Sequence, residues 1–529
     1  MIRIQNLTFA PGEDSREALL RAAAKALRLR RAQIRALEIH RRSVDARKKQ
    51  DVRVIYTVDV AVDGSEEAVL RAARNPKAGI ASDPVYTPPQ AIRTDERPVV
   101  VGFGPAGMFA ALLLAQAGLR PIVLERGQDA AARHEAVRRF WESGTLDPAC
   151  NVQFGEGGAG TFSDGKLNTG VNDVRIRWIL EQFVAAGADK SILYDAKPHI
   201  GTDVLLTVVQ NLRRRILDLG GEVRFGTQLV GVMQEAGALC GVETLCDGRR
   251  ETLFCRRVIL AVGHSARDTF ELLHGMGLPM EPKAFSMGVR IEHRQTMVNE
   301  SQYGAFTAKL GAADYKLNVR FPDGTSAYTF CMCPGGTVVA AASETGGVVT
   351  NGMSDFARGG ENANAALLVT LTPEDFPDKS VLGGMYWQRA IEQAAFRAGG
   401  GNYRAPAQLA GDFLARRASM ALDAVTPTYR PGVTLCDLHD VLPPRITDVL
   451  EQALPALDRK LHGFADPDAV LTAPETRSSS PVRILRDGTR QSTGLRGLYP
   501  CGEGAGYAGG ITSAAVDGLR CAEALIESM

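Results

Sequence analysis

The stretch from Val99 to Gly107 constrains the fold of this chain more than any other. It reads VVVGFGPAG, an apolar run typical of a short buried strand followed by a G-x-G-x-x-G turn. An apolar helix, residues 108–116, follows the turn, and a second strand, residues 121–124, leads to Glu125. Strand, turn, helix, strand and acidic residue in this order predict a βαβ unit that binds a dinucleotide.

Each glycine of the turn has a physical task in such a unit. Gly102 permits the tight turn, Gly104 lets the backbone approach a pyrophosphate, and Gly107 lets the helix pack close to the strand. The helix N-terminus offers free N–H groups and a positive dipole end to the phosphates. Glu125 follows where a carboxylate accepts hydrogen bonds from an adenosine ribose, which favours NAD or FAD over NADP.

A second glycine-rich turn distinguishes FAD from NAD. Residues 497–511 read GLYPCGEGAGYAGGI and lead into a helix. This turn resembles the second FAD signature of glutathione-reductase-type flavoproteins, and residues 258–263 resemble their middle signature. The resemblance implies that Glu503, in place of the commoner Asp, holds the ribityl chain, and that the following helix N-terminus faces the flavin N1–C2 edge. Three signatures in this order predict FAD as the cofactor.

Longer strings narrow the resemblance to one group. Residues 154–167, 328–336, 351–354 and 475–483, together with the turn at 502–510, resemble a bacterial group described only as FAD-dependent dehydrogenases or NAD(P)/FAD-dependent oxidoreductases. The resemblance extends over essentially the whole chain. We therefore expect an oxidoreductase that transfers a hydride between a small-molecule substrate and flavin N5, with NAD(P)H or another soluble redox partner as co-substrate. The identity of the substrate stays open.

The residues expected to contact FAD come from these turns and from the glycine-rich loop at 155–160, which resembles a loop laid against the cofactor. They are Gly102, Gly104, Pro105, Ala106, Gly107, Glu125, Arg126, Gly158, Thr161, Ser163, Lys166, Val230, Ala261, Gly263, Gly502, Glu503, Gly509, Gly510 and Ile511. The loop at 155–160 also fits G-x-G-x-x-G formally. No apolar helix follows it, so we expect no second nucleotide fold there.

Three charged residues are the candidate catalytic groups. Lys166 would place positive charge near the flavin N1 edge, or else pair with a nearby acid for structure. Arg477 would clamp a substrate carboxylate and Glu475 would act as acid or base. The alternative for these two is a salt-bridged loop that holds a cap domain against the FAD domain. The single histidines His199 and His264 are expected to be structural.

The nine cysteines show no regular spacing and no C-x-x-C motif, which favours a reducing compartment. Cys331 and Cys333 stand two apart on an expected strand, so their side chains should share a face. A redox pair is one interpretation, and two small buried apolar residues is the favoured one. Since structural zinc takes four ligands, we predict no metal site.

The chain is predicted to be an α/β protein in three parts, with a discontinuous, three-layer Rossmann-like FAD-binding domain. Residues 1–90 would form a small basic α+β domain. The FAD-binding domain would comprise residues 91–278, beginning at 95 after a linker, and residues 471–529. A β-rich substrate or cap domain, residues 279–470, would be inserted between them.

Local patterns define the first part and its connection. Asp14-x-x-Glu17 predicts a capping box at the start of a helix that continues to Leu27. Residues 52–62 alternate between apolar and polar side chains, which predicts a half-buried strand. Residues 75–98 contain five prolines and predict a linker.

Charge and composition exclude few functions. Lys and Arg number 61 against 60 Asp and Glu, which gives no global reason to expect nucleic acid or a membrane surface. Glycine is abundant, at 55 of 529 residues, without a collagen period, so the excess must lie in particular turns. The N-terminus lacks a signal peptide, and glycines and Pro105 break the uncharged stretch 98–119, so we expect a cytoplasmic protein without a membrane span.

One local charge excess keeps an alternative open. Residues 21–53 contain twelve Lys and Arg and three acidic residues. Such a segment could grip RNA, which would make the protein a flavin-dependent RNA-modifying enzyme. A solvated face or an internal docking surface is favoured, because no aromatic pair offers a stacking platform for bases. A non-catalytic flavin-binding sensor is the remaining alternative, and the oligomeric state stays open.

Overall fold

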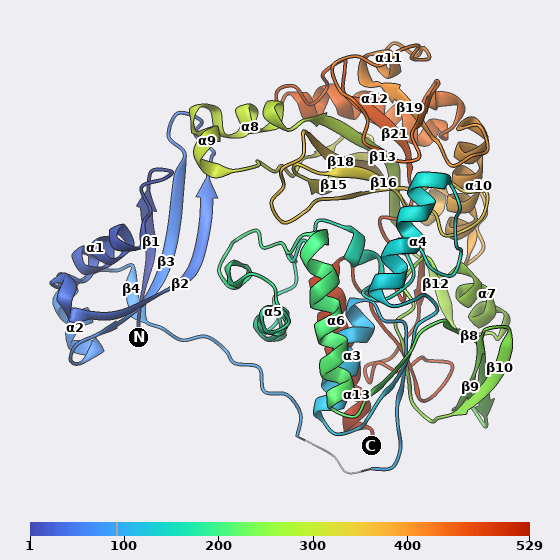
Figure 1. The fold of residues 1–529 in the computed structure, drawn as a ribbon, viewed down its shortest axis with the longest axis horizontal. Coiled ribbons are helices and arrows are strands. Elements are labelled where there is room, and N and C mark those ends of the chain that lie inside the picture. The colour runs from blue at the N-terminus through green and yellow to red at the C-terminus, as the bar shows by residue number, and fades with distance from the viewer. Residues whose placement is uncertain (91–93) are drawn as a thin grey trace.

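The computed structural model describes residues 1–90 and 94–529. Figure 1 shows a small N-terminal domain on the left, a larger α/β part at the lower right, and a cap built on a mainly antiparallel sheet at the top. Among the described residues, no helix combines the length and the apolar character that crossing a membrane requires.

The N-terminal domain is a four-stranded antiparallel sheet covered by two helices. The strand order is β2 (Ile34–Asp45), β3 (Arg53–Val62), β1 (Ile2–Phe9) and β4 (Ala78–Ile80), and the helices are α1 (Arg16–Leu27) and α2 (Glu66–Ala73). Burial alternates along β3, which confirms the predicted half-buried strand.

Two local predictions in this domain were wrong. The N-cap of α1 is Ser15, whose hydroxyl accepts a hydrogen bond from Ala18 N at 3.2 Å, and Asp14 instead accepts one from the Tyr56 hydroxyl at 2.7 Å. Asp14 and Ser15 are both residue types that cap helices, and the hydrogen bond from Tyr56 engages the Asp14 side chain elsewhere. The predicted linker is not all linker, because β4 adds a strand to the sheet beside β1. The predicted domain boundary at residue 91 lies outside the described residues.

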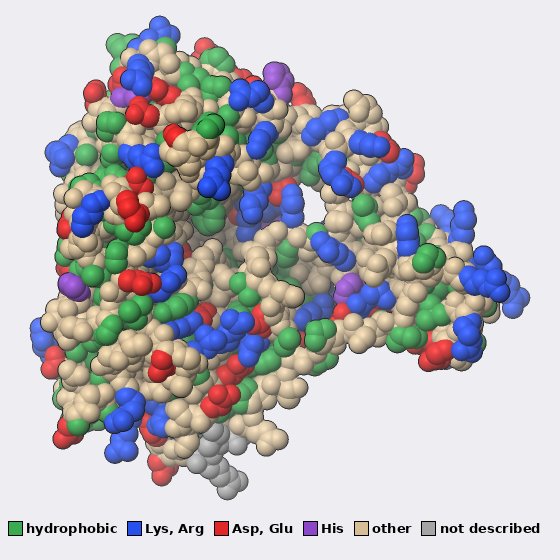
Figure 2. All heavy atoms as spheres, turned by 180° about the vertical axis from the view of Figure 1, so that it is seen from behind, with side chains coloured by type: hydrophobic (Ala, Val, Ile, Leu, Met, Phe, Trp, Pro, Cys, Tyr) green, Lys and Arg blue, Asp and Glu red, His purple; other side chains and the backbone are tan. Residues whose placement is uncertain are grey.

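The basic segment of the N-terminal domain supplies contacts to the rest of the chain. Arg42 forms a two-point ion pair with Asp195, at 2.6 and 2.7 Å, and backbone hydrogen bonds join Arg42 to Tyr194 and Ala196. Lys49 donates to the backbone carbonyl of Gln302 at 2.9 Å. These contacts support the interpretation as a docking surface. Other Lys and Arg side chains lie on the outer face of this domain, at the right of Figure 2.

The α/β part has three layers. Its centre is a parallel sheet in the order β23 (Leu498–Pro500), β11 (Val258–Leu260), β5 (Val99–Val101), β6 (Ile122–Leu124) and β7 (Glu222–Arg224). One face is covered by α3 (Pro105–Gln116), α5 (Arg175–Ala185), α6 (Thr202–Asp218) and α13 (Ile511–Glu527). The other carries a three-stranded antiparallel sheet, β8 (Thr227–Glu235), β9 (Ala238–Cys246) and β10 (Arg249–Phe254), with α7 (Arg267–Gly275).

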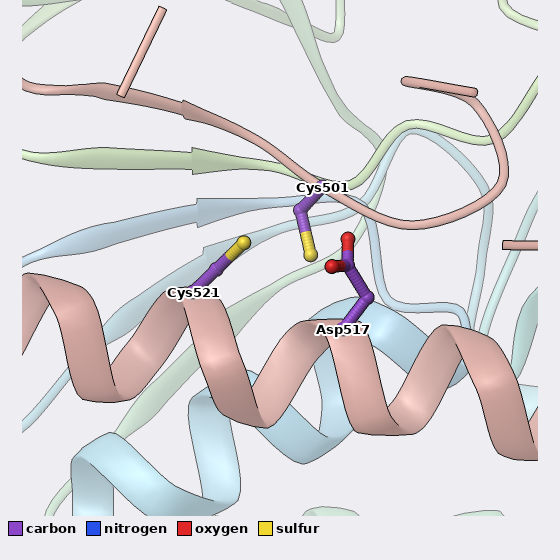
Figure 3. Close-up of side chains that lie close together, drawn as sticks. All are labelled: Cys501, Asp517 and Cys521. Carbon is purple, nitrogen blue, oxygen red and sulfur yellow. The ribbon is translucent and has the colours of Figure 1, made fainter. Parts of the chain in front are cut away.

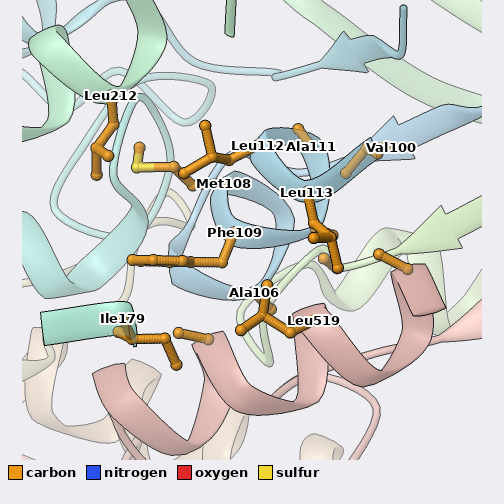
Figure 4. Close-up of a cluster of buried hydrophobic side chains, with 14 of the residues drawn as sticks. Val100, Ala106, Met108, Phe109, Ala111, Leu112, Leu113, Ile179, Leu212 and Leu519 are labelled. Carbon is orange, nitrogen blue, oxygen red and sulfur yellow. The ribbon is translucent and has the colours of Figure 1, made fainter. Parts of the chain in front are cut away.

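Side-chain alternation along the central strands explains the layering. Val100 of β5 packs with the helices, whereas Val99 and Val101 pack with the three-stranded sheet. Helix α3 is apolar all round and lies in the middle of the helical layer. Figure 4 shows its side chains among Ile179 of α5, Leu212 of α6 and others.

The cap is built on a seven-stranded sheet. Its order is β14 (Asn318–Arg320), β15 (Ser326–Cys333), β18 (Asn362–Leu371), β13 (Phe285–Arg294), β21 (Val470–Glu475), β19 (Ala405–Leu409) and β20 (Val433–Leu435). Its helices are α8 (Gln295–Tyr303), α9 (Thr307–Leu310), α10 (Gly383–Ala398), α11 (Ala410–Leu414) and α12 (Pro444–Asp458). Only β19 and β20 pair in parallel.

One further helix and two short strand pairs complete the α-helices and strands of the described residues. They are α4 (Ala130–Ser143) and the two-stranded pairs β12 (Met280–Pro282) with β22 (Val482–Ile484) and β16 (Thr337–Ala340) with β17 (Thr350–Met353). The predicted boundary between residues 470 and 471 falls inside β21, which pairs with both β13 and β19. Glu475 therefore ends a strand of the cap sheet.

The contact between α3 and α13 yields a stability prediction. A Cβ added at Gly518 would overlap the carbonyl oxygen of Ala106. We expect Gly518→Ala to lower the free energy of unfolding by about 1–3 kcal/mol through overpacking, as measured by urea denaturation. Gly275→Ala is the matched control, since nothing lies within 4 Å of the added Cβ there. An equal loss in both variants would contradict the prediction.

Candidate functional site

The main candidate site is a cavity of about 450 Å³ between the parallel sheet and the cap. Val101, Leu124, Ala261 and Cys501, at the carboxyl ends of four neighbouring parallel strands, all line it. Ligands of open α/β sheets bind beyond this edge. The cap contributes residues 314–316 and 329–332, so a single cavity contacts both parts of the chain.

Most residues predicted to contact FAD line this cavity. They are Gly102, Gly104, Pro105, Ala106, Glu125, Arg126, Gly158, Ser163, Lys166, Ala261, Gly263, Glu503, Gly509, Gly510 and Ile511. They come from turns spread over more than four hundred residues of chain, and the fold brings these turns together.

Four predicted contacts do not line the cavity. Gly107 lies inside α3, where an added Cβ would overlap the carbonyl oxygen of Gly102, so it serves the packing of helix on turn. Gly502 donates its N–H to Asp517 at 2.8 Å, and Thr161 is buried with its hydroxyl donating to the Glu156 carbonyl at 3.2 Å. Val230 does not line the cavity either, whereas its neighbour Leu229 does, because side chains alternate along β8.

The predicted dinucleotide turn has the expected local order, with β5, α3 and β6 in sequence. Gly102 has φ +95°, and a Cβ there would overlap the carbonyl oxygen of Ala261, so this position requires glycine on both counts. Gly104 is the N-cap of α3 and has only the Cα of Gly158 within 4 Å of its added Cβ. Gly104, Pro105 and Ala106 all line the cavity, so the N-terminal end of α3 borders it.

Glu125 is held in place by backbone donors. Its carboxylate accepts hydrogen bonds from the N–H groups of Phe103, Gly127 and Gly155, each at 2.9 Å. The side chain is buried and still lines the cavity. One carboxylate thus ties the dinucleotide turn to the glycine-rich loop and keeps oxygen lone pairs available to a ligand hydroxyl.

Arg133 anchors the same loop, and no sequence motif pointed to it. The side chain is fully buried and donates to the carbonyls of Asn151, Val152 and Glu156 at 2.6–2.9 Å. Burial lowers the pKa of Arg133 to about 10. The only sequence signal was a charged residue on the buried face of α4, which is rare unless its donors are satisfied.

Lys166 lines the cavity and has only a distant carboxylate partner in the protein. Its ammonium lies 3.9 Å from the Asp164 carboxylate, beyond hydrogen-bond distance. Asp164 is instead paired with Arg358 through two contacts, at 3.0 and 2.5 Å. The alternative, that Lys166 pairs with an acid for structure, therefore rests on one weak ion pair. The positive charge of Lys166 remains available to a ligand.

Glu475 and Arg477 line the cavity as members of buried ion pairs. Glu475 accepts from Arg290 at 2.7 and 3.1 Å, and Arg477 donates to Glu392 at 2.9 and 3.1 Å. Arg267 also binds Glu392. Burial raises the pKa of Glu392, but the two guanidinium groups outweigh it and hold that pKa well below its usual range. These contacts match the interpretation of a salt-bridged segment, because the guanidinium edge a substrate carboxylate would need is occupied.

The two single histidines differ. His199 contacts the Phe356 carbonyl at 3.1 Å through Nε2 and stacks on the Phe356 ring, as a structural residue does. His264 lines the cavity with Nδ1 at 3.2 Å from Glu503, and its buried Nε2 has no protein partner. A buried unpartnered nitrogen at a cavity indicates a ligand atom.

A cluster of possible metal ligands adjoins the cavity, which one of its members, Cys501, lines. Figure 3 shows Cys501, Asp517 and Cys521, whose ligand atoms lie within 4.8 Å of one another. Arg486 already binds Asp517 through two contacts, at 2.7 and 2.9 Å, and the Gly502 N–H donates to the same carboxylate. Because the carboxylate charge is neutralised, the cluster is a poor cation site.

The residues around the cavity fit FAD. An added Cβ at Gly263, Gly509 or Gly510 would meet nothing within 4 Å, so the backbone borders open space at two turns. The free N–H groups of α3, the carboxylate of Glu125 and the unpartnered nitrogen of His264 offer the donors and acceptors that a dinucleotide needs.

Comparison with known proteins supports this assignment. Residues 284–478 match the family described as FAD-dependent protein, C-terminal domain-like, and residues 1–61 match a domain of unknown function. The predicted dependence on FAD agrees with the first description. An uncharacterized protein of Clostridium beijerinckii is 46% identical over 99% of this chain and 98% of its own length. The chain belongs to the same family as that protein.

Solved structures of low identity also align with the chain. A geranylgeranyl bacteriochlorophyll reductase-like protein from Thermoplasma acidophilum is 13% identical, with a TM-score of 0.35, covering 82% of this chain and 78% of that one. Glycine oxidase from Bacillus cereus is 12% identical, with a TM-score of 0.30, covering 82% of this chain and 96% of that one.

The role of Glu125 can be tested by substitution. Glu125→Ala leaves three buried N–H groups without an acceptor, so we expect it to lower the free energy of unfolding by at least about 2 kcal/mol and to weaken FAD binding. Glu125→Gln keeps one acceptor oxygen, so we expect smaller losses of stability and of FAD affinity than in Glu125→Ala. Denaturation and flavin titration measure the two effects; a stable Glu125→Ala protein with normal FAD affinity would refute the assignment.

Proposed function

We propose that the chain is an FAD-dependent oxidoreductase that transfers a hydride between a small-molecule substrate and flavin N5. The observation that carries the proposal is the single cavity that joins the dinucleotide turn to the cap. A long cofactor bound along the sheet edge would present its far end to the cap residues. The match to an FAD-dependent family supports the choice of cofactor.

Residues from four segments would hold the cofactor. The N-terminus of α3 would bind the pyrophosphate, Glu125 the adenosine ribose and Glu503 the ribityl chain. The N-terminus of α13, at Ile511, would face the pyrimidine edge of the flavin. FAD, when bound, supplies the hydride-accepting chemistry, and the protein supplies orientation, water exclusion and charge.

Lys166 would provide that charge. Its ammonium lies 3.9 Å from the Asp164 carboxylate, which Arg358 already binds, and the side chain lines the cavity. A cation beside the flavin favours the anionic reduced form, because electrostatic attraction acts strongly in a site shielded from water. Glu475 and Arg477 act here by position, holding the end of β21 against the cavity through their ion pairs.

We infer that NAD(P)H, or another soluble redox partner, reaches the flavin through this same cavity. Residues 99–107 are the one strand-turn-helix G-x-G-x-x-G unit in the sequence, so a pyridine nucleotide would have no second fold of that type. Substrate and reductant would then use one flavin face in alternation.

The first experiment identifies the cofactor. We expect the purified protein to be yellow, to show a flavin visible spectrum, and to release FAD on denaturation, as chromatography against FAD and FMN standards will show. Anaerobic mixing with NADH and with NADPH should then bleach the spectrum with at least one of them. A colourless protein that takes up no added FAD would overturn the proposed function.

Lys166→Met tests the charge. We expect this variant to retain FAD and to shift the two-electron reduction potential of the flavin by about 30 mV to more negative values, which corresponds to about 1.4 kcal/mol. Equilibration with a reference dye measures the potential. Lys190→Met, at an exposed position outside the cavity, is the control. An unchanged potential in Lys166→Met would leave Lys166 a structural residue.

A further inference from the structure

We propose that Cys331 and Cys333 form a dithiol–disulfide pair that exchanges two electrons with the bound flavin. The inference deepens the proposed function, on which it rests, by adding a second redox group at the cap side of the same cavity.

Cys331 lies in a β-bulge. The register of β15 against β18 shifts between Phe330 and Cys333, and Cys331 has φ +42°. This left-handed conformation is unfavourable for a residue with a side chain, and such strain concentrates at functional sites. The bulge interrupts the regular alternation from which a shared strand face of the two cysteines was predicted.

The bulge changes which side chains meet the cavity. Four consecutive residues, 329–332, line it, which a regular strand cannot achieve. Cys331 is therefore at the cavity, whereas Cys333 is fully buried beside it. One sulfur is placed to react with a cavity ligand and the other to resolve the product.

The two cysteines are close enough to bridge. An extended pair two residues apart spans at most about 7 Å between Cα atoms, which is near the upper limit for a disulfide. The Cys333 thiol folds back and donates to the Cys331 carbonyl at 3.2 Å. Both cysteines are free in this structure.

The surroundings favour a thiolate at Cys331. The Cys333 thiol is the main cause that holds the pKa of Cys331 well below its usual range, because its single proton can turn from the Cys331 carbonyl to a thiolate at Cys331. The charges of Lys166 and Arg290 act in the same direction, and burial acts against them. The pKa of Cys333 is raised, since it donates to its neighbour and is buried. Arg290 also donates to the Cys331 carbonyl at 2.9 Å. Nucleophilic cysteines occupy such electropositive settings.

The exchange balances as follows. Oxidation of the Cys331 thiolate and the Cys333 thiol forms one S–S bond, releases one proton and gives up two electrons. The flavin takes up both electrons and one proton, so its anionic reduced form results. In the reverse direction the reduced flavin cleaves the disulfide, and the pair stores the electrons for a substrate that enters the cavity.

Thiol mapping tests the pair without reference to the flavin. The full-length protein is treated with the thiol oxidant diamide, alkylated with iodoacetamide, digested and analysed by mass spectrometry. We expect one bridge, within the single tryptic peptide 321–358, which becomes two hydrogen masses lighter and takes up no alkyl group. Alkylation of all nine cysteines, or a bridge between Cys501 and Cys521 alone, would overturn the proposal.

Electron uptake tests the link to the flavin. In an anaerobic dithionite titration, the oxidised protein should consume twice the electrons per FAD that Cys331→Ser and Cys333→Ser consume. The double variant Cys240→Ser/Cys246→Ser, on β9 and away from the cavity, should match the wild type. Thermal melts of all variants show whether each is folded, and Cys331→Ala provides a second test at the cavity.

The outcomes separate the two claims. FAD bound with equal electron uptake in wild type and both serine variants would refute the cysteine pair and leave the proposed oxidoreductase intact. A protein that binds no FAD would refute the proposed function and the electron exchange together, even if the bridge forms. Faster alkylation of Cys331 than of Cys240 below pH 8 would support the thiolate, and equal rates would count against it.

Discussion

The close approach of backbone to backbone around one cavity is the constraint on which the structure depends. A Cβ at Gly127 would lie 2.5 Å from Gly155, one at Gly158 would lie 2.9 Å from Gly104, and one at Gly504 would lie 2.5 Å from Gly263. No side chain fits between these turns. The strand ends, the glycine-rich loop and the C-terminal turn can therefore converge, and their N–H groups can face a long ligand.

Buried charge holds these irregular segments in place. Arg133 donates hydrogen bonds to loop carbonyls, and Glu125 accepts them from loop N–H groups. These backbone groups therefore have partners although the segments lack regular secondary structure. On the cap side, Arg290 with Glu475 and Arg477 with Glu392 do the same for the end of β21. The cavity is thus lined by polar groups whose positions are set before any ligand binds.

Sequence patterns predicted the parts whose signals are local. Apolar runs and glycine spacing located β5, α3 and β6, and alternation located β3. The errors arose where a tertiary contact decided the outcome. Ser15 caps α1 because Tyr56 engages Asp14. Leu229, and not Val230, meets the cavity because β8 presents that face to it.

By itself, the sequence determined that this chain has a dinucleotide-type βαβ unit and further glycine turns, because each is a short run with its own steric requirement. Only the tertiary structure decided what the charged and sulfur-bearing residues contact. It placed Arg477 in an ion pair, left Lys166 facing the cavity, and used a bulge to bring Cys331 to the cavity. Such roles depend on partners that are distant in sequence, and a local sequence pattern cannot show which distant residues come into contact.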